Sequence, residues 1–150
     1  MRLAAALLLI AAACAGGASS RRWDEPAVHR LRVTVSRDVV VDAPMLQPQG
    51  VRLRAALLRS LQLAGFRLPD MQGADLVIRL WLGRSAGGLT AELSAISPAG
   101  ESIDDLRSTV RGAVDSDQAL DDLARDLTRK LELSPRVQSL ARAGSAGPPP

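Results

Sequence analysis

Carboxylates are the most abundant side chains in this sequence that could act as catalytic acids or bases. Asp104 and Asp105 stand beside a turn, and Asp121 and Asp122 stand in a helix-forming segment. A carboxyl dyad needs two groups that face one another, whereas neighbours at i and i+1 on a helix point in different directions. Helix capping and surface charge therefore explain these carboxylates better than acid–base catalysis.

The single histidine, His29, has no nucleophile or metal ligand at a recognisable spacing. One Cys and one His exclude a multi-cysteine zinc site and a histidine pair. No glycine-rich loop precedes a lysine, and residues 83–88 are typical of a hairpin connection. We therefore predict no catalytic residue, no metal site and no cofactor. The alternative is a hydrolase that combines Asp104 or Asp105 with His29.

The charge of the chain does not indicate a nucleic-acid ligand. The 150 residues carry a net charge of +3, and Lys130 is the only lysine among 19 basic residues. Basic and acidic residues alternate along most of the chain and form no basic run. We predict a mixed, solvated surface and no nucleic-acid partner.

The N-terminus has the pattern of an export signal. Met1 and Arg2 precede an unbroken apolar run over residues 3–13. As a helix this run would be about 16 Å long, roughly half of a bilayer core. It is too short for a transmembrane helix and suits the apolar region of a signal peptide. We assign residues 1–13 to the signal, and no later stretch is long enough to span a membrane.

The end of the signal resembles the lipobox of bacterial lipoproteins. Three alanines at residues 11–13 precede Cys14, although leucine is commonest at the position of Ala11. The resemblance implies that the thiol of Cys14 receives a diacylglyceryl group, that the signal is cut before Cys14 and that the new amino group is acylated. Several acyl chains give stable anchoring. Ala15, which is not aspartate, implies sorting to the periplasmic face of the outer membrane.

Two other interpretations of the N-terminus stay open. Ordinary signal peptidase could cut after Ala18 and leave a soluble periplasmic or secreted protein. Cys14 could also be an incidental small apolar residue of the signal. In either case the chain would carry no lipid anchor.

Composition divides the remainder of the chain into three parts. Small and polar residues over 14–27 predict a flexible tether, and the Pro- and Gly-rich residues 142–150 predict a disordered tail. The folded domain should therefore occupy residues 28–141.

Alternation of apolar and polar residues predicts the strands. The expected strands are residues 29–36, 74–82, 89–96 and 103–111. Residues 66–69 form a possible short strand. The valines at 39–41 form either a short edge strand or an interaction segment, since Pro44 and Pro48 exclude a central strand there.

Apolar stripes at helical spacing predict two helices, over residues 51–64 and 116–133. Asp115 or Ser116 should cap the second helix, and Ser134–Pro135 should end it. The pairs Asp121–Arg125 and Asp126–Lys130 have the favourable i,i+4 order. Residues 136–141 could add one turn.

The element order β-α-β-β-β-α predicts an α+β fold. We expect a two-layer sandwich, in which a mainly antiparallel sheet of three to five strands carries both amphipathic helices on one face. The free sheet face, or the edge near residues 38–48, is then the expected binding surface.

This pattern also looks like the small α/β domains of the TolB N-terminal, LpoB and CsgG types. The residues that carry the resemblance are segments 65–68, 74–80 and 97–101 and the leucine-rich terminal helix. It implies a periplasmic, non-catalytic module that binds an envelope protein, whose identity it does not give. The hydrolase alternative would then be an envelope enzyme.

Overall fold

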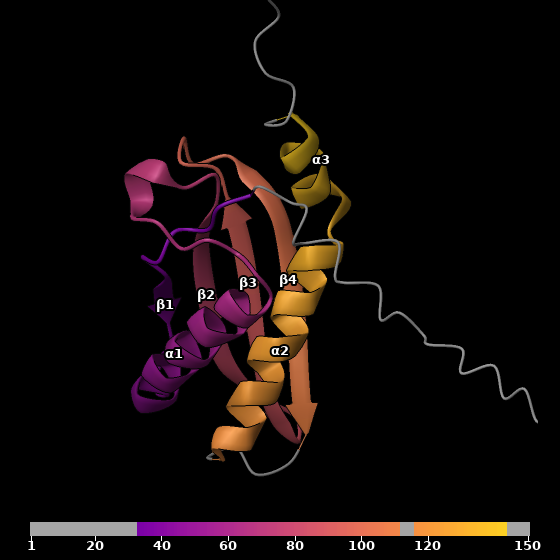
Figure 1. Cartoon of the computed structure of the whole chain (residues 1–150). Coiled ribbons are helices and arrows are strands. Elements are labelled where there is room, and N and C mark those ends of the chain that lie inside the picture. Colours follow the sequence, from indigo (N-terminus) through magenta and orange to yellow (C-terminus); the bar gives the residue numbers. More distant parts are fainter. Residues whose placement is uncertain (1–32, 112–115, 144–150) are drawn as a thin grey trace, which may run out of the picture.

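The computed structural model describes residues 33–111 and 116–143, which form one sheet layer and one helix layer (Figure 1). The sheet order is β1-β2-β3-β4, with β1 parallel to β2 and the other neighbours antiparallel. The strands are β1 (Val40–Asp42), β2 (Val77–Ser85), β3 (Gly88–Ile96) and β4 (Ser102–Arg111). The helices are α1 (Gln47–Leu63), α2 (Asp117–Leu133), α3 (Pro135–Ala143) and the short 3-10 helix η2 (Met71–Gly73). The predicted α+β class is confirmed.

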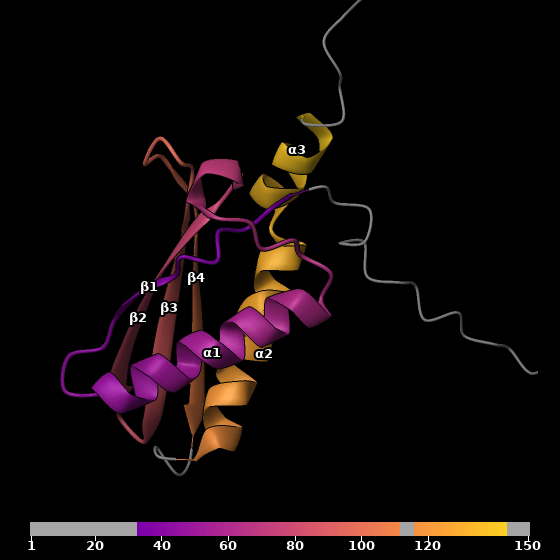
Figure 2. The same cartoon turned by 60° about the vertical axis from the view of Figure 1, so that its left-hand side comes forward.

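Helices α1 and α2 cross the same face of the sheet, as the sequence predicts (Figure 2). The expected leucine stripes lie against it: Leu53, Leu57 and Leu61 of α1 are fully buried, as are Leu127 and Leu131 of α2. Leu80 of β2 and Leu93 of β3 face them from the sheet in one register row with Val41 and Leu106. The core therefore lies between the two layers and is built almost entirely from aliphatic side chains.

The first strand is not where the alternation places it. Residues 29–32 of the predicted strand lie outside the described residues, and the rest forms only isolated bridges, from Thr34 to Arg67 and from Val35 to Leu76. Val33 and Val35 are buried, as an alternating pattern requires. Thr34 and Val35 thus pair with two different segments of the chain, and each segment contributes a single bridge. No regular strand ladder develops for this reason. The valine segment supplies the edge strand β1 instead.

Helix α1 begins four residues before the predicted start. Pro48 lies in its first turn, where the missing N–H has no helical acceptor in any case. Helix α2 begins after Ser116, whose side chain accepts a hydrogen bond from the N–H of Ala119 at 3.1 Å, and ends before Ser134 as predicted.

Two connections also differ from the prediction. Strands β2 and β3 continue through Gly83 and Gly88 into a tight turn, where Gly87 has a φ of 89°. A third helix, α3, replaces the expected single turn, because Val137 and Ala141 bury against the core.

Candidate interaction surface

Two of the residues singled out from the sequence, Cys14 and His29, lie outside the described residues. The structure therefore tests neither the lipid attachment nor a site built on His29. The predicted signal, tether and tail also lie outside, except for the last residues of α3.

Asp104 and Asp105 lie on opposite faces of β4. Asp104 is on the helix side, where its carboxylate accepts a hydrogen bond of 2.5 Å from Ser134 Oγ at the end of α2. Asp105 is paired with Ser94 and stands exposed on the other face. Asp104 thus joins β4 to the α2–α3 junction, and the two carboxylates do not converge on one site.

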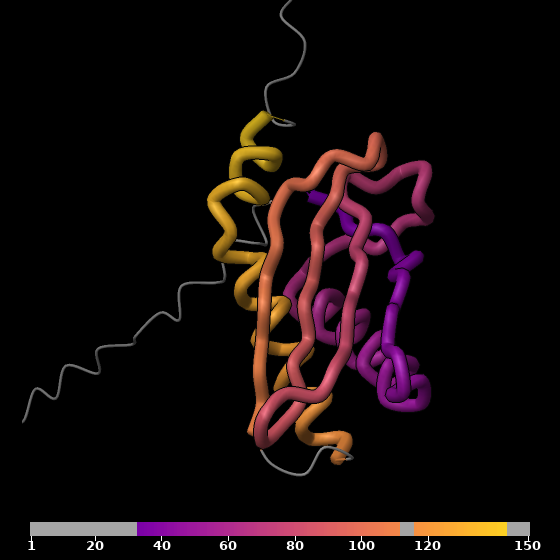
Figure 3. The backbone as a smooth tube through the Cα atoms, turned by 180° about the vertical axis from the view of Figure 1, so that it is seen from behind, coloured from indigo at the N-terminus to yellow at the C-terminus, as the bar shows by residue number. Residues whose placement is uncertain are grey.

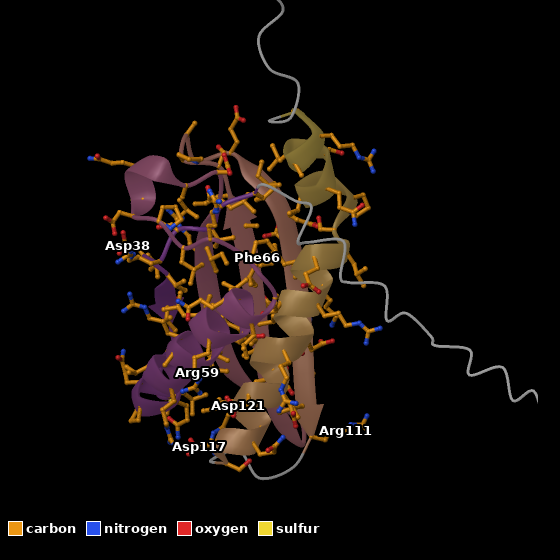
Figure 4. All side chains as sticks on the ribbon, in the orientation of Figure 1. Asp38, Arg59, Phe66, Arg111, Asp117 and Asp121 are labelled. Atoms are coloured by element: carbon orange, nitrogen blue, oxygen red, sulfur yellow. The ribbon has the colours of Figure 1, made fainter. Side chains whose placement is uncertain are left out.

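Asp121 and Asp122 are occupied in separate ion pairs. Asp121 lies 3.2 Å from Arg59 of α1, and Figure 4 shows these two side chains between the helices. Asp122 pairs with Arg125 at 3.1 Å. The predicted Asp121–Arg125 pair is therefore wrong, because a partner on the neighbouring helix draws Asp121 away. Asp126 and Lys130 do form the predicted pair, at 2.6 Å.

The pKa of the Asp126 carboxylate is lower than its ordinary value. Partial burial raises the pKa of Asp126, but hydrogen bonds from Lys130 and Ser108, with the positive charges of Lys130 and Arg129, outweigh that effect and lower it. Ser108 of β4 donates to this carboxylate at 2.7 Å. The Asp126 carboxylate therefore connects α2 to β4 through Ser108. Its lowered pKa is explained by these contacts and does not indicate a catalytic role.

Beside β1, a hollow of about 200 Å³ opens between the strand and the first turns of α1. It is lined by Val39, Val41, Ala43, Gln47, Gly50, Val51 and Arg54. Most of these are aliphatic or glycine, and Arg54 is the one charged residue of the lining. A cavity of roughly 150 Å³ can hold a benzene molecule, so the hollow is large enough for an apolar side chain.

Exposed apolar side chains surround the same edge. Val40 of β1 is 59% exposed, Val51 of α1 is 69% exposed and Met45 in the connecting loop is 99% exposed. Single exposed apolar residues are ordinary, whereas several grouped beside the open edge of an outer strand mark a surface for association. This grouping lies within or next to the 38–48 segment that the sequence favours. We call Val40–Asp42, Met45 and the residues that line the hollow the β1 surface.

The second predicted surface, the sheet face away from α1 and α2, is visible from behind in Figure 3. Trp81 is 38% exposed there, and its ring lies across Gly83, where an added Cβ would overlap it. The pair Glu92–Arg107 at 3.5 Å and the hydrogen-bonded Thr90 and Thr109 lie beside it on the neighbouring strands. This face is thus mainly polar, with one aromatic residue.

The hollow itself was not foreseen from the sequence. The hollow forms because α1 begins at Gln47 and because Gly50 lies close to Ala43. The apolar stripe predicts a helix that begins only at residue 51, so it indicates neither feature. Glycine within a helical pattern was the available signal, because it commonly marks a close backbone approach.

The described residues contain no group of three or more His, Cys, Asp or Glu side chains that could hold a metal ion. Within the same part of the chain, no helix is both long and apolar enough to cross a bilayer.

Comparison with known proteins gives little further information. No protein-family model matches the chain, and no curated protein matches it significantly. A solved structure, the PelC dodecamer from Paraburkholderia phytofirmans, is similar with a TM-score of 0.49 and 17% sequence identity, over 75% of this chain and 91% of that one. At this level the likeness says nothing about function.

Proposed function

We propose that this chain is a lipid-anchored bacterial envelope protein that binds a protein partner and catalyses no reaction. The observation that carries the binding role is the β1 surface, where a hollow lined partly by exposed Val51 opens beside an edge strand. Val40 on the strand and Met45 in the loop after it add further exposed apolar side chains. The polypeptide would act as an accessory in the assembly or activity of its partner.

The anchor would be Cys14, which directly follows the short apolar run at residues 3–13. Lipidation and cleavage there would make it the first residue of the mature protein, and Ala15 favours the periplasmic face of the outer membrane. The folded domain would then stand in the periplasm, joined to the membrane through the segment before Val33.

Mass spectrometry of the chain purified from membranes of a Gram-negative host tests the anchor. We expect an N-terminal peptide that begins at Cys14 and carries acyl chains, and co-fractionation with the outer membrane. The variant Cys14→Ser should leave the membrane fraction, whereas Ser19→Ala, a change at the competing cleavage region, should not. An unacylated N-terminus at Ser19 would show instead a soluble exported protein.

The hydrolase alternative would combine Asp104 or Asp105 with His29. Asp104 and Asp105 lie on opposite faces of β4, and Asp104 is engaged with Ser134. If the enzyme reading were correct, hydrolysis of envelope-derived substrates by the purified chain would be lost in Asp105→Asn.

A further inference from the structure

The two outer strands of the sheet differ in how their backbones are covered. On β4, Lys130 Nζ donates to the carbonyl of Arg107 at 2.6 Å, and Arg136 Nη1 donates to the carbonyl of Ile103 at 3.0 Å. Among the described residues, no side chain donates to the backbone of Val40–Asp42. An outer strand leaves alternate N–H and C=O groups unpaired. Hence β1 is the edge where another strand can form.

The hollow adds side-chain recognition to this backbone edge. Side chains of a strand alternate between the two faces of its sheet. A strand laid against β1 would therefore direct every second side chain toward the helix face, where Val39, Val41 and Val51 line the hollow. Main-chain hydrogen bonds then provide affinity and the hollow provides selectivity, as in other cases of strand addition.

Arg54 indicates the charge of the incoming segment. Its neighbours on α1 are both neutralised, Arg52 by Asp117 at 2.9 Å and Arg59 by Asp121 at 3.2 Å. Arg54 forms no ion pair with any described carboxylate, and it stands exposed at the hollow. A guanidinium group binds carboxylates through paired N–H donors. An acidic side chain would complement it.

From these three features we infer that β1 accepts an extended segment of a partner protein as a fifth strand. An aliphatic side chain of that segment fills the hollow, and an Asp or Glu on the same face, two residues away, pairs with Arg54. This inference rests on the proposal that the chain works by binding a protein, and it names the chemistry of the bound segment.

A library of random dodecapeptides displayed on phage, selected on the full chain in detergent, tests it. We expect enrichment of peptides with an aliphatic residue two positions from an Asp or Glu and with no central proline. The best peptide, labelled with fluorescein, would bind with a Kd of about 10 μM to 1 mM in fluorescence polarisation, because the strand edge is short. Peptides that are N-methylated at one position at a time should lose binding at every second position only, because only alternate N–H groups of a paired strand face its neighbour.

Matched variants then locate the contacts. Arg54→Glu should weaken this peptide at least about tenfold, whereas Arg111→Glu at the end of β4 should not. Val51→Asp should weaken it similarly, whereas Leu63→Asp, an exposed apolar residue near the other end of α1, should not.

Three results would overturn the inference: no enriched motif, equal enrichment on Arg54→Glu, or an N-methylation profile without alternation. Each can occur while Cys14 is acylated and the chain is in the outer membrane. The failure of this inference is therefore distinguishable from the failure of the proposed anchor.

Discussion

At the scale of single residues, Gly50 controls how closely α1 approaches the β1 segment. A Cβ at this position would lie 2.7 Å from the Cβ of Ala43 and 3.2 Å from Cγ1 of Val41. The Cβ of Ala43 is fixed by the backbone, so it cannot move aside by side-chain rotation. The absence of a side chain at Gly50 thus shapes the hollow beside β1.

We expect Gly50→Ala to destabilise the fold. Overpacking costs about 1–3 kcal/mol, and the helix propensity of alanine offsets at most about 1 kcal/mol of it. The free energy of unfolding from urea denaturation measures the difference. In Gly73→Ala the new Cβ meets Pro69 at an ordinary 3.6 Å, so that control should change little. The double variant with Ala43→Gly should recover stability, and a stabilised Gly50→Ala would contradict the close approach.

Asp126 should make the free energy of unfolding decrease at acidic pH. Because its pKa is lower in the folded state than in the unfolded chain, the ionised carboxylate stabilises the fold above about pH 4, and this contribution disappears as the pH falls through the folded pKa. Asp126→Asn should therefore lose less stability than the parent chain between pH 5 and pH 2. Urea denaturation at each pH measures this loss.

The control for this pH series is Asp38→Asn, because the Asp38 carboxylate forms no hydrogen bond or ion pair within the described residues. The free energy of unfolding of Asp38→Asn should change with pH by the same amount as that of the parent chain. Parallel curves for Asp126→Asn would instead show that the contacts with Lys130 and Ser108 do not persist in solution.

At the scale of elements, α2 and α3 protect the outer edge of β4. Lys130 and Arg136 each satisfy a carbonyl of this strand, and both are long cationic side chains that would be buried unfavourably by an added strand. Charged side chains at an edge are a common means of preventing unwanted pairing. The sheet is thus closed to association on one side and accessible on the other.

Removing this protection should promote self-association. We expect the double variant Lys130→Ala, Arg136→Ala to form dimers or larger species at concentrations where the parent chain does not, as measured by sedimentation velocity. The double variant Arg125→Ala, Arg129→Ala removes the same charge from the same region but exposes no β4 carbonyl. Equal association of the two double variants would attribute the effect to net charge.

The regular elements follow from the sequence wherever one pattern persists over many residues. Strands β2 and β3 and helix α2 were predicted because Leu80, Leu93 and Leu127 each belong to a long periodic run. Three residues of β1 are too few to show a period, and their strand depends on pairing with Arg79–Trp81. The residues before them alternate correctly, yet their bridging partners come from two separate segments.

Interactions between elements were the least predictable part. The i,i+4 rule gave Asp126–Lys130 correctly, but it could not anticipate that Arg59 of α1 would approach Asp121. The β1 surface depends in the same way on tertiary placement. Its segment was recognised from valines between prolines, whereas its hollow requires the packing of α1 against Ala43.

At the scale of the whole molecule, one aliphatic core joins segments from both ends of the described chain. Val33 and Val35 near its start and Val137 and Ala141 of α3 belong to the same buried cluster. A domain with one contiguous core normally unfolds in a single cooperative transition. Helix α3 should therefore unfold together with the sheet, although it packs at the end of α2.

This cooperativity can be measured with Trp81, which reports on the sheet once Trp23→Phe has removed the other tryptophan. In urea, Trp81 fluorescence and far-ultraviolet circular dichroism should give the same midpoint. Val137→Ala leaves a cavity beside α3 and should lower both midpoints equally, with a loss of about 1–3 kcal/mol in the free energy of unfolding. The control Val51→Ala changes an exposed position and should lower neither midpoint appreciably. If Val137→Ala shifted the dichroism alone, α3 would be a separate unit, because the sheet around Trp81 would then keep its stability without it.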